Sequence, residues 1–430
     1  MIFGVELRRR RIAAGLSLAD LATLVNYSKG YLSKIENGRQ PVSVDVARRC
    51  DAELGAGGAL VELASRRGRA GPRPDVDIDH DGEAWVMNLG ANGTGWFAPV
   101  GRRDVLAAGT ASLLGLSLTS RGFAAAARQD DMLLALRALF VQVRRIGQMA
   151  GPSVVLPLLI PQTRTLRHLA ANAVGQHRDQ LLLLAARYAE YTGWMAQEAG
   201  DDRAALWWTR LAVRIADDAG DKDLAAHAWV RQALITMYQE DAIQTIELAR
   251  QAQAEHRAQP RIRGHAALRE AQGHALAGDY DGFRRTLDRA TTLFDEPSAH
   301  GVDGLVLGSS TVPDFVTVVE AWCLYDLGRP RLAADLLDRA LPEIAETNHR
   351  SRARWGARLA MAHAAVGNLD HACALTDDVL VAVELVDSAT IRLDLRRLAR
   401  ALTRWRTHQP VRELQPRITA ALHIRERHPT

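Results

Sequence analysis

One kind of turn recurs along the last two thirds of this 430-residue chain, and it constrains the fold more than any other feature. The turn appears as EAGDD, LAGDY, DLGRP and AVGNL, with its glycines at Gly200, Gly278, Gly328 and Gly367. Mostly small residues stand seven positions before, and five and twelve positions after, these glycines; Phe283 is the clearest departure. Because a glycine ends one helix and small side chains let the next helix approach closely, the pattern predicts a series of antiparallel helix pairs.

From about residue 131 to 425 the apolar residues follow helical spacing almost throughout. The glycine pattern in this region resembles the tetratricopeptide (TPR) repeat over roughly 165–425, in an elongated and degenerate form. The resemblance implies an α-solenoid, in which each helix pair contacts only its neighbours. A further pair around Ala242, Ile246 and Ala249 fits the second helix of the repeat but lacks the glycine turn. An irregular helical bundle is the alternative fold.

In a TPR solenoid, certain positions of the first helix of each pair line a concave groove. By the register of the glycines, the resemblance implies a ligand groove formed by Arg187, Trp194, Gln197, His227, Arg231, Gln272, Trp322, Tyr325 and Arg354, with Glu190, His265, Phe315 and Met361 at further groove positions. Aromatic and guanidinium groups together suit a peptide or an anionic small molecule, through stacking and bidentate pairing. Ordinary helix packing by Trp194 and Trp322 is the alternative.

The basic residues of the chain are distributed unevenly. Residues 1–70 hold 12 Lys and Arg against 7 Asp and Glu, whereas the remaining 360 residues hold 42 against 43. The excess of positive charge therefore lies in the first sixth of the chain, where it can attract a polyanion. Of the 54 basic residues only Lys29, Lys34 and Lys222 are lysines, and two of these stand five positions apart in the segment SKGYLSKIENGRQP.

Short helices are predicted around this segment. Ser17 can cap a helix that begins at Leu18, Asn26 occupies a turn that favours a left-handed backbone, and Ser28 can cap the next helix. The segment LRRRRIAAGLSLADLATLVNYSKGYLSKIENGRQP resembles the Cro/C1 (XRE) family of helix-turn-helix domains over about 60 residues. Asn26 stands where this family usually has glycine. The resemblance implies a five-helix domain whose third helix enters the DNA major groove.

The resemblance also implies which residues contact DNA. These are Ser17, Ser28, Lys29, Gly30, Tyr31, Ser33, Lys34, Asn37 and Arg39. Lys29, Gly30 and Lys34 match the positions that read bases, and a lysine can donate to guanine O6 and N7. Ser17, Tyr31, Asn37 and Arg39 match positions that hold phosphates and set the register. Two lysines that are merely solvated on an exposed helix face are the alternative.

The fold class expected is all-α. We expect a Cro/C1-type DNA-binding domain at 1–65, a linker and connecting segment at 66–130, and a TPR-like sensor and dimerisation domain at 131–430. Within the connecting segment, Trp85–Val100 reads as either a hairpin or a packed loop, and Arg102–Leu116 as a helix.

Several classes of protein are not expected. No run approaches the roughly 18 apolar residues of a membrane span, and three scattered cysteines do not form a disulfide framework, so we expect a cytoplasmic protein. In HAAVGNLDHAC a turn separates His363 from His371 and Cys373, and no HExxH, paired CxxC or GxSxG occurs. We therefore expect no metal, no cofactor and no enzymatic activity.

The favoured interpretation is a homodimeric transcriptional regulator that binds double-stranded operator DNA and senses a signal in its TPR-like domain. The combination resembles the cytosolic receptors of Gram-positive bacteria that bind signalling peptides. Those receptors hold the peptide backbone largely with asparagines, and none of the groove positions here is asparagine. An anionic small molecule therefore stays open beside a peptide. The alternative function is a TPR protein-interaction scaffold with auxiliary DNA binding.

Overall fold

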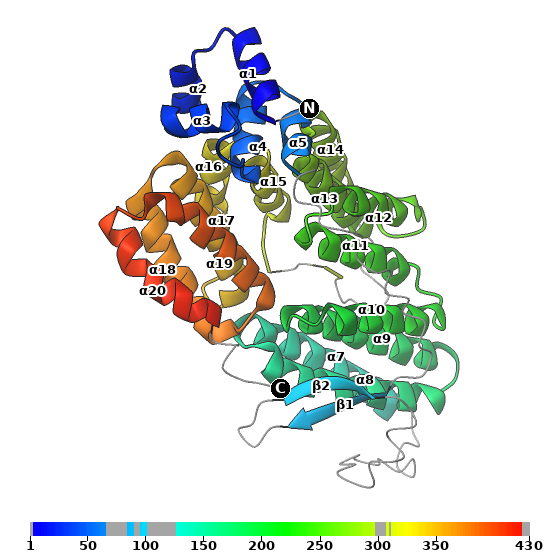
Figure 1. Ribbon diagram of the computed structural model, residues 1–430. Coiled ribbons are helices and arrows are strands. Elements are labelled where there is room, and N and C mark those ends of the chain that lie inside the picture. The colour runs from blue at the N-terminus through cyan, green and yellow to red at the C-terminus, as the bar shows by residue number, and fades with distance from the viewer. Residues whose placement is uncertain are drawn as a thin grey trace.

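The computed structural model describes residues 3–65, 84–89, 95–100, 126–296, 307–308 and 311–423. Within these ranges the chain is helical apart from connecting turns and one two-stranded hairpin, which confirms the all-α prediction (Figure 1). In the hairpin, β1 (Ala84–Leu89) pairs antiparallel with β2 (Gly95–Val100). Of the two predictions for Trp85–Val100, a hairpin or a packed loop, the hairpin is therefore the one observed. The helix predicted at Arg102–Leu116 lies outside the described residues, as does most of the predicted 66–130 segment.

Five short helices form the N-terminal part of the molecule. They are α1 (Phe3–Ala13), α2 (Leu18–Leu24), α3 (Lys29–Glu36), α4 (Val44–Glu53) and α5 (Ala59–Ser65). Their apolar faces meet in a small core that includes the fully buried Leu7, Leu21 and Leu32. Ser17 and Ser28 cap α2 and α3 as predicted, since each hydroxyl accepts a backbone N–H of the first turn.

The rest of the described chain consists of helices that pack in antiparallel pairs. The helices are α7 (Ala126–Met149), α8 (Pro152–Ala171), α9 (Gly175–Glu198), α10 (Asp202–Asp217), α11 (Asp223–Tyr238), α12 (Ala242–Ala254), α13 (Pro260–Ala277), α14 (Tyr280–Asp295), α15 (Phe315–Asp326), α16 (Pro330–Ala340), α17 (His349–Val366), α18 (Leu369–Val386), α19 (Ala389–Leu402) and α20 (Gln409–His423), with a 3-10 helix at Thr403–Trp405. The first helices of successive pairs also touch, so that α11, α13, α15 and α17 follow one another in a row.

The turns within the pairs have the backbone that the glycine pattern predicted. Gly200, Gly278, Gly328 and Gly367 have φ of 83°, 78°, 76° and 91°, a left-handed region that glycine enters without steric cost. The pair α11–α12, which lacks the glycine, makes the same turn with Glu240 at φ 61°. The turn between α11 and α12 therefore has the same left-handed backbone although it lacks the glycine.

The row of pairs closes on itself. Helices α17 and α19 pack against α7 and α9, so the last pairs return to the first (Figure 1). At this closure Arg350 pairs with the carboxylate of Glu198 and donates to the carbonyl of Gly147 at 2.7 Å. Thr390 donates to the same carboxylate at 2.8 Å. The expectation that each pair contacts only its neighbours is wrong here, because these buried polar contacts join the two ends into a closed ring.

Candidate nucleic-acid interface and central cavity

Helix α3 presents the residues expected to read bases on its outer face. Leu32 and Ile35 are buried in the N-terminal core, which leaves Lys29, Gly30 and Lys34 exposed. A Cβ atom built at Gly30 would meet nothing within 4 Å, so this part of the helix surface is open. The exposed face of α3 therefore carries two lysines, and Gly30 leaves the backbone beside Lys29 uncovered by a side chain.

The residues expected at phosphates surround this face. Ser17, Ser28, Asn37 and Arg39 are exposed, while Tyr31 and Ser33 are half-buried. The ring of Tyr31 stacks on Tyr27 with a centroid distance of 5.4 Å. The side-chain amide of Asn37 donates to the carbonyl of Ser33 at 2.8 Å, so part of its hydrogen-bonding capacity serves the end of α3.

The four arginines of α1 share two carboxylates of their own domain, which offset part of their positive charge. Arg9 and Arg10 pair with Glu6, and these hydrogen bonds lower the pKa of Glu6 to about 2. Arg8 and Arg11 pair with Glu36, with Arg11 Nε at 2.7 Å from the carboxylate. Within the described residues, by contrast, the exposed cations Lys29, Lys34 and Arg39 form no ion pair. Among those residues, these three exposed cations therefore have no carboxylate partner that competes with a nucleic acid.

The N-terminal helices rest on the turns of three successive helix pairs (Figure 1). A Cβ atom at Gly278 would lie 2.7 Å from the Cα of Gly58, and one at Gly328 would lie 2.5 Å from the carbonyl oxygen of Arg48. A Cβ atom at Gly367 would lie 3.6 Å from the side-chain amide of Asn26. The glycines that shape the turns therefore also make room for the N-terminal domain.

Polar contacts fix this docking. Arg48 Nη1 lies 2.8 Å from Asp326 Oδ1, and both side chains are largely buried. Asn26 Nδ2 and Arg49 Nη1 each donate to the carbonyl of Ala365 at 3.0 Å. The guanidinium of Arg404 lies 4.1 Å from the ring centroid of Tyr27.

A cavity of about 850 Å³ lies inside the ring, and most of its polar wall comes from the first helices of the pairs. Of the residues predicted for a ligand groove, six line this cavity: Arg187, Trp194, His227, Arg231, Trp322 and Arg354. Glu190, His265 and Phe315 line it as well. The register of the turn glycines therefore brings residues from five different helices into one space.

The other three predicted ligand residues, and Met361, are not in the cavity wall. The amide oxygen of Gln197 accepts from Arg231 Nη2 at 2.9 Å, and that of Gln272 accepts from Arg269 Nη1 at 2.5 Å. Each glutamine therefore contacts an arginine of the cavity wall without lining the cavity itself. The hydroxyl of Tyr325 is close to the charges of Asp45, Arg49 and Arg48, and burial raises its pKa. Tyr325 therefore belongs to the docking interface, and Met361 to the core of α17–α20.

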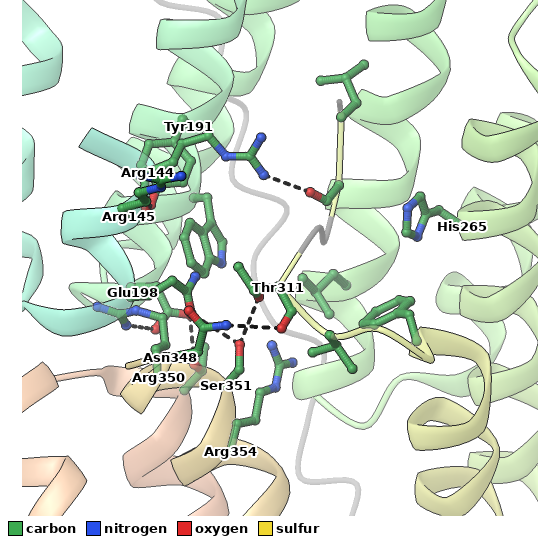
Figure 2. Close-up of a pocket in the computed structure, with 18 of the residues that line it drawn as sticks. Arg144, Arg145, Tyr191, Glu198, His265, Thr311, Asn348, Arg350, Ser351 and Arg354 are labelled. Atoms are coloured by element: carbon green, nitrogen blue, oxygen red, sulfur yellow. Dashed lines mark hydrogen bonds and ion pairs between the residues drawn. The ribbon is translucent and has the colours of Figure 1, made fainter. Parts of the chain in front are cut away.

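Several wall residues were missed by the sequence prediction. Arg269 follows His265 by four positions and Arg350 precedes Arg354 by four, so helical spacing from predicted residues would have found both. Arg144 and Arg145 line the wall from α7, which precedes the first glycine turn and so had no register, and Tyr191 of α9 lies beside them (Figure 2).

The segment between α14 and α15 also lines the cavity. Its Gly308 carbonyl accepts from Arg144 at 3.1 Å, and the Thr311 carbonyl accepts from Asn348 at 3.2 Å. The hydroxyls of Thr311 and Ser351 are 3.0 Å apart. Figure 2 shows Thr311 between His265 on one side and the group of Arg350, Asn348 and Ser351 on the other.

Glu190, Glu198 and His265 of the cavity wall have shifted pKa values. Burial alone would raise the pKa of Glu190, but the hydrogen bond with His227 and the charges of His227, Arg231 and Arg144 lower it to about 2. Burial would likewise raise the pKa of Glu198, but the charges of Arg350 and Arg354 and the hydrogen bonds from Ser388 and Thr390 together lower it. Burial and nearby arginines hold the pKa of His265 well below its usual value, so this ring is neutral at pH 7.

One group among the described residues has the ligand types of a metal site. The nitrogen or oxygen atoms of Asp338, His363 and His371 all lie within 4.8 Å of one another, and the two rings are 4.4 Å apart. The turn that was expected to separate the two histidines instead brings them together. His363 Nε2 lies 3.1 Å from Asp338 and its Nδ1 lies 3.4 Å from the amide of Asn368. Hydrogen bonds therefore satisfy His363 without an ion.

Among the helices of the described ranges, none is both long and apolar enough to cross a membrane. Comparison with curated proteins finds no match to the chain. A family model of a helix-turn-helix domain matches residues 2–64, which are the residues of α1–α5. The exposed face of α3, its free cations and this match agree, and the N-terminal part of the protein is a helix-turn-helix DNA-binding domain.

Proposed function

We propose that the protein is a transcriptional regulator whose helical ring binds a signal molecule in its central cavity and controls the attached DNA-binding domain. We assign the DNA-binding domain to the Cro/C1 (XRE) type and the helix pairs to a TPR-like repeat, on the turn pattern described above. No catalytic step is assigned to the cavity.

The observation that carries the proposal is a carboxylate shared by the cavity wall and the DNA-binding domain. Trp322 lines the cavity, and its Nε1–H donates to Asp326 Oδ2 at 2.9 Å. The other oxygen of Asp326 accepts from Arg48, in helix α4, at 2.8 Å. A ligand that moves the indole of Trp322 therefore acts on the group that anchors the DNA-binding domain, with no intervening residue.

The closed ring favours a small ligand over a protein partner. A scaffold would need an open groove that admits a helix or an extended segment, whereas here the first and last pairs meet through Arg350 and Glu198. The cavity volume of about 850 Å³ lies within the range of small-molecule sites, roughly 300–1,000 Å³.

The proposal includes a homodimer. One helix-turn-helix domain reads a half-site, and specific operators of this type are read by two-fold dimers with half-sites about one helical turn apart. Sedimentation of the full-length protein, free and on its DNA, tests this part. A monomer at micromolar concentration in both conditions would remove the dimer from the proposal.

The main experiment is selection of binding sites from a random duplex library with the full-length protein, followed by measurement of affinity for the selected site. The Lys29→Ala/Lys34→Ala double variant is expected to lose the selected sequence preference. Trp322→Phe removes the donor to Asp326 and is expected to change operator affinity. Trp194→Phe is the matched control, because Trp194 lines the same cavity without contacting the DNA-binding domain. Equal behaviour of the two tryptophan variants would contradict coupling through Asp326.

A further inference from the structure

The cavity wall carries more positive than negative charge. Seven arginines line it against three glutamates, which are Glu190, Glu198 and Glu343. Asp221 pairs with Arg187 at 3.1 Å from outside the lining. Even with that carboxylate included, the arginines outnumber the carboxylates by three among these described residues.

Two of the arginines have only neutral acceptors among the described residues. Arg269 is 6% exposed, and it donates to the amide oxygen of Gln272 at 2.5 Å and lies 3.9 Å from the sulfur of Met237. Arg354 donates to the hydroxyl of Tyr238 and, within the described chain, lies near no carboxylate in ion-pairing range. Within the described chain, Arg269 therefore has no carboxylate beside it. Arg354 has no carboxylate in ion-pairing range there, although burial is outweighed by the charges of Tyr238, Asp394 and Glu198, which raise its pKa.

Such an arrangement is unfavourable while the cavity holds only water. Burying a cation without an opposite charge is costly, and like charges nearby add to the cost. Burial and the positive charges of Arg354 and Arg231 lower the pKa of Arg269 to about 9. Burial and the charge of Arg354 also lower the pKa of Arg231, although Glu190 opposes this shift. Arg231 also has an ion-pair partner, since its Nε lies 3.7 Å from the Glu190 carboxylate. An oxoanion between these three groups would supply the counter-charge that Arg269 lacks.

The cations lie against an aromatic wall. The guanidinium of Arg354 is 5.3 Å from the ring centroid of Tyr238, 5.5 Å from that of Trp322 and 5.9 Å from that of Trp355. The two indole rings are 5.9 Å apart. An anionic group held by the arginines would therefore place the body attached to it on aromatic faces, which favours a planar or apolar body.

We propose that the cavity binds an organic oxoanion, a carboxylate or phosphate on a planar aromatic body, with Arg231, Arg269 and Arg354 holding the anionic group. Trp322 and Trp355 contact the body. This inference deepens the proposed function by naming the ligand class, but it concerns binding alone and is tested without DNA.

The test uses the full-length protein and three probes that share one ring system: naphthoate, naphthyl phosphate and the neutral naphthamide. Calorimetry and thermal shift are expected to show binding of at least one anionic probe and none of naphthamide. Preference between the two anions distinguishes a carboxylate from a phosphate ligand. Inorganic phosphate alone is expected to bind more weakly than naphthyl phosphate. Failure of both anionic probes, or equal binding of naphthamide, would overturn the inference.

Substitutions separate a ligand-binding arginine from a structural one. Arg269→Met is expected to weaken binding of the anionic probe by about 10- to 100-fold, yet to leave the ligand-free melting temperature equal or higher, because an uncompensated buried cation is removed. Arg350→Met is the matched control. It leaves the buried carboxylate of Glu198 without its ion-pair partner and is therefore expected to lower the melting temperature. If Arg269→Met destabilises the protein as much as Arg350→Met does and binds the probes as the parent does, Arg269 is structural and the inference fails.

The two proposals fail separately. If an anionic probe binds but operator affinity does not change, the proposal that the cavity controls DNA binding is refuted, whereas the proposed ligand class stands. Operator binding by a protein that ignores all the anionic probes would refute the ligand class and leave the DNA-binding function in place.

Discussion

The side-chain amide of Asn26, in the turn before the recognition helix, donates to the carbonyl of Ala365 across 339 positions of sequence, at 3.0 Å. Asn26 has φ 55°, so the residue makes the turn of the helix-turn-helix motif and also anchors it to the ring. Glycine, the usual residue at this turn, would make the turn but not the anchor. Asn26 in place of glycine, the difference from the Cro/C1 pattern that this segment resembles, thus has a structural reason in the contact between the two domains.

Asn26→Gly isolates that contact, because glycine adopts the same backbone without strain. The variant is expected to lose about 0.5–1.5 kcal/mol of docking free energy, the net value of one hydrogen bond. Hydrogen–deuterium exchange should rise in peptides covering the Gly367 turn, while exchange in the core of α1–α5 stays as in the parent. Unchanged exchange at the turn would show that Arg49 alone suffices to hold Ala365.

Gly328→Ala is expected to weaken the docking more strongly. Both Gly328 and Gly220 have left-handed backbones, with φ of 76° and 73°, so alanine at either position costs about 1–2 kcal/mol in strain. Only at Gly328 does the added Cβ also meet the carbonyl of Arg48, at 2.5 Å, whereas at Gly220 it meets nothing within 4 Å. Chemical denaturation of both variants should therefore show a larger loss for Gly328→Ala. Equal losses would mean that the two domains separate readily at this point.

Lys34→Ala should cost about 1–3 kcal/mol at a selected operator and relax the preference at one base pair. Arg39→Ala should weaken specific and random duplexes alike and reduce the slope of affinity against salt concentration, as expected for a phosphate contact. Fluorescence anisotropy on both kinds of duplex at several salt concentrations checks the two expectations. A Lys34→Ala variant that loses affinity equally for both duplexes would assign Lys34 to the backbone.

Stability is expected to fall in acid through the cavity carboxylates. A carboxyl with a pKa of about 2 in the folded protein and 4.5 as a model group stabilises the fold fully above about pH 4.5, and this contribution is lost as the pH falls toward 2. Glu190→Gln should remove a contribution of about 3 kcal/mol at pH 7 and flatten the decline of the melting temperature below pH 4.5. Calorimetry from pH 7 to 2.5 measures both. Parallel curves for variant and parent would place the acid sensitivity elsewhere, for example at Glu270, whose pKa is also about 2.

Local signals predicted the parts of the structure that depend on local chemistry. The caps at Ser17 and Ser28, the left-handed turn at Asn26 and the glycine turns all follow from residue types that prefer one backbone, and each is present. The exposed face of α3 followed from the burial of Leu32 and Ile35. The small-residue register brought Arg187, Arg231 and Arg354 into one cavity because helical spacing fixes which side a residue occupies.

Contacts between distant parts of the chain were outside the reach of such signals. Nothing in the spacing around Glu198 indicates a partner at Arg350, because ring closure depends on the accumulated rotation between successive pairs. The same holds for Arg48 and Asp326, which belong to different domains. Tyr325 was assigned to the groove although it faces the docked domain, since a periodic pattern shows which residues share a face but not which molecule or domain covers it.

Ring closure at Glu198 also sets an order of events during synthesis of the protein. Arg350 is made 152 residues after Glu198, a delay of roughly 8–30 s at about 5–20 residues per second. Throughout that interval the glutamate has neither its arginine nor its hydroxyl partner Thr390, so the first helices of the ring cannot reach their final burial. The DNA-binding domain, by contrast, leaves the ribosome first and has its own core. A nascent chain therefore contains the helix-turn-helix domain before the residues of the cavity wall are all made. Under the proposed function, translation that stops between the two would release a DNA reader without its control.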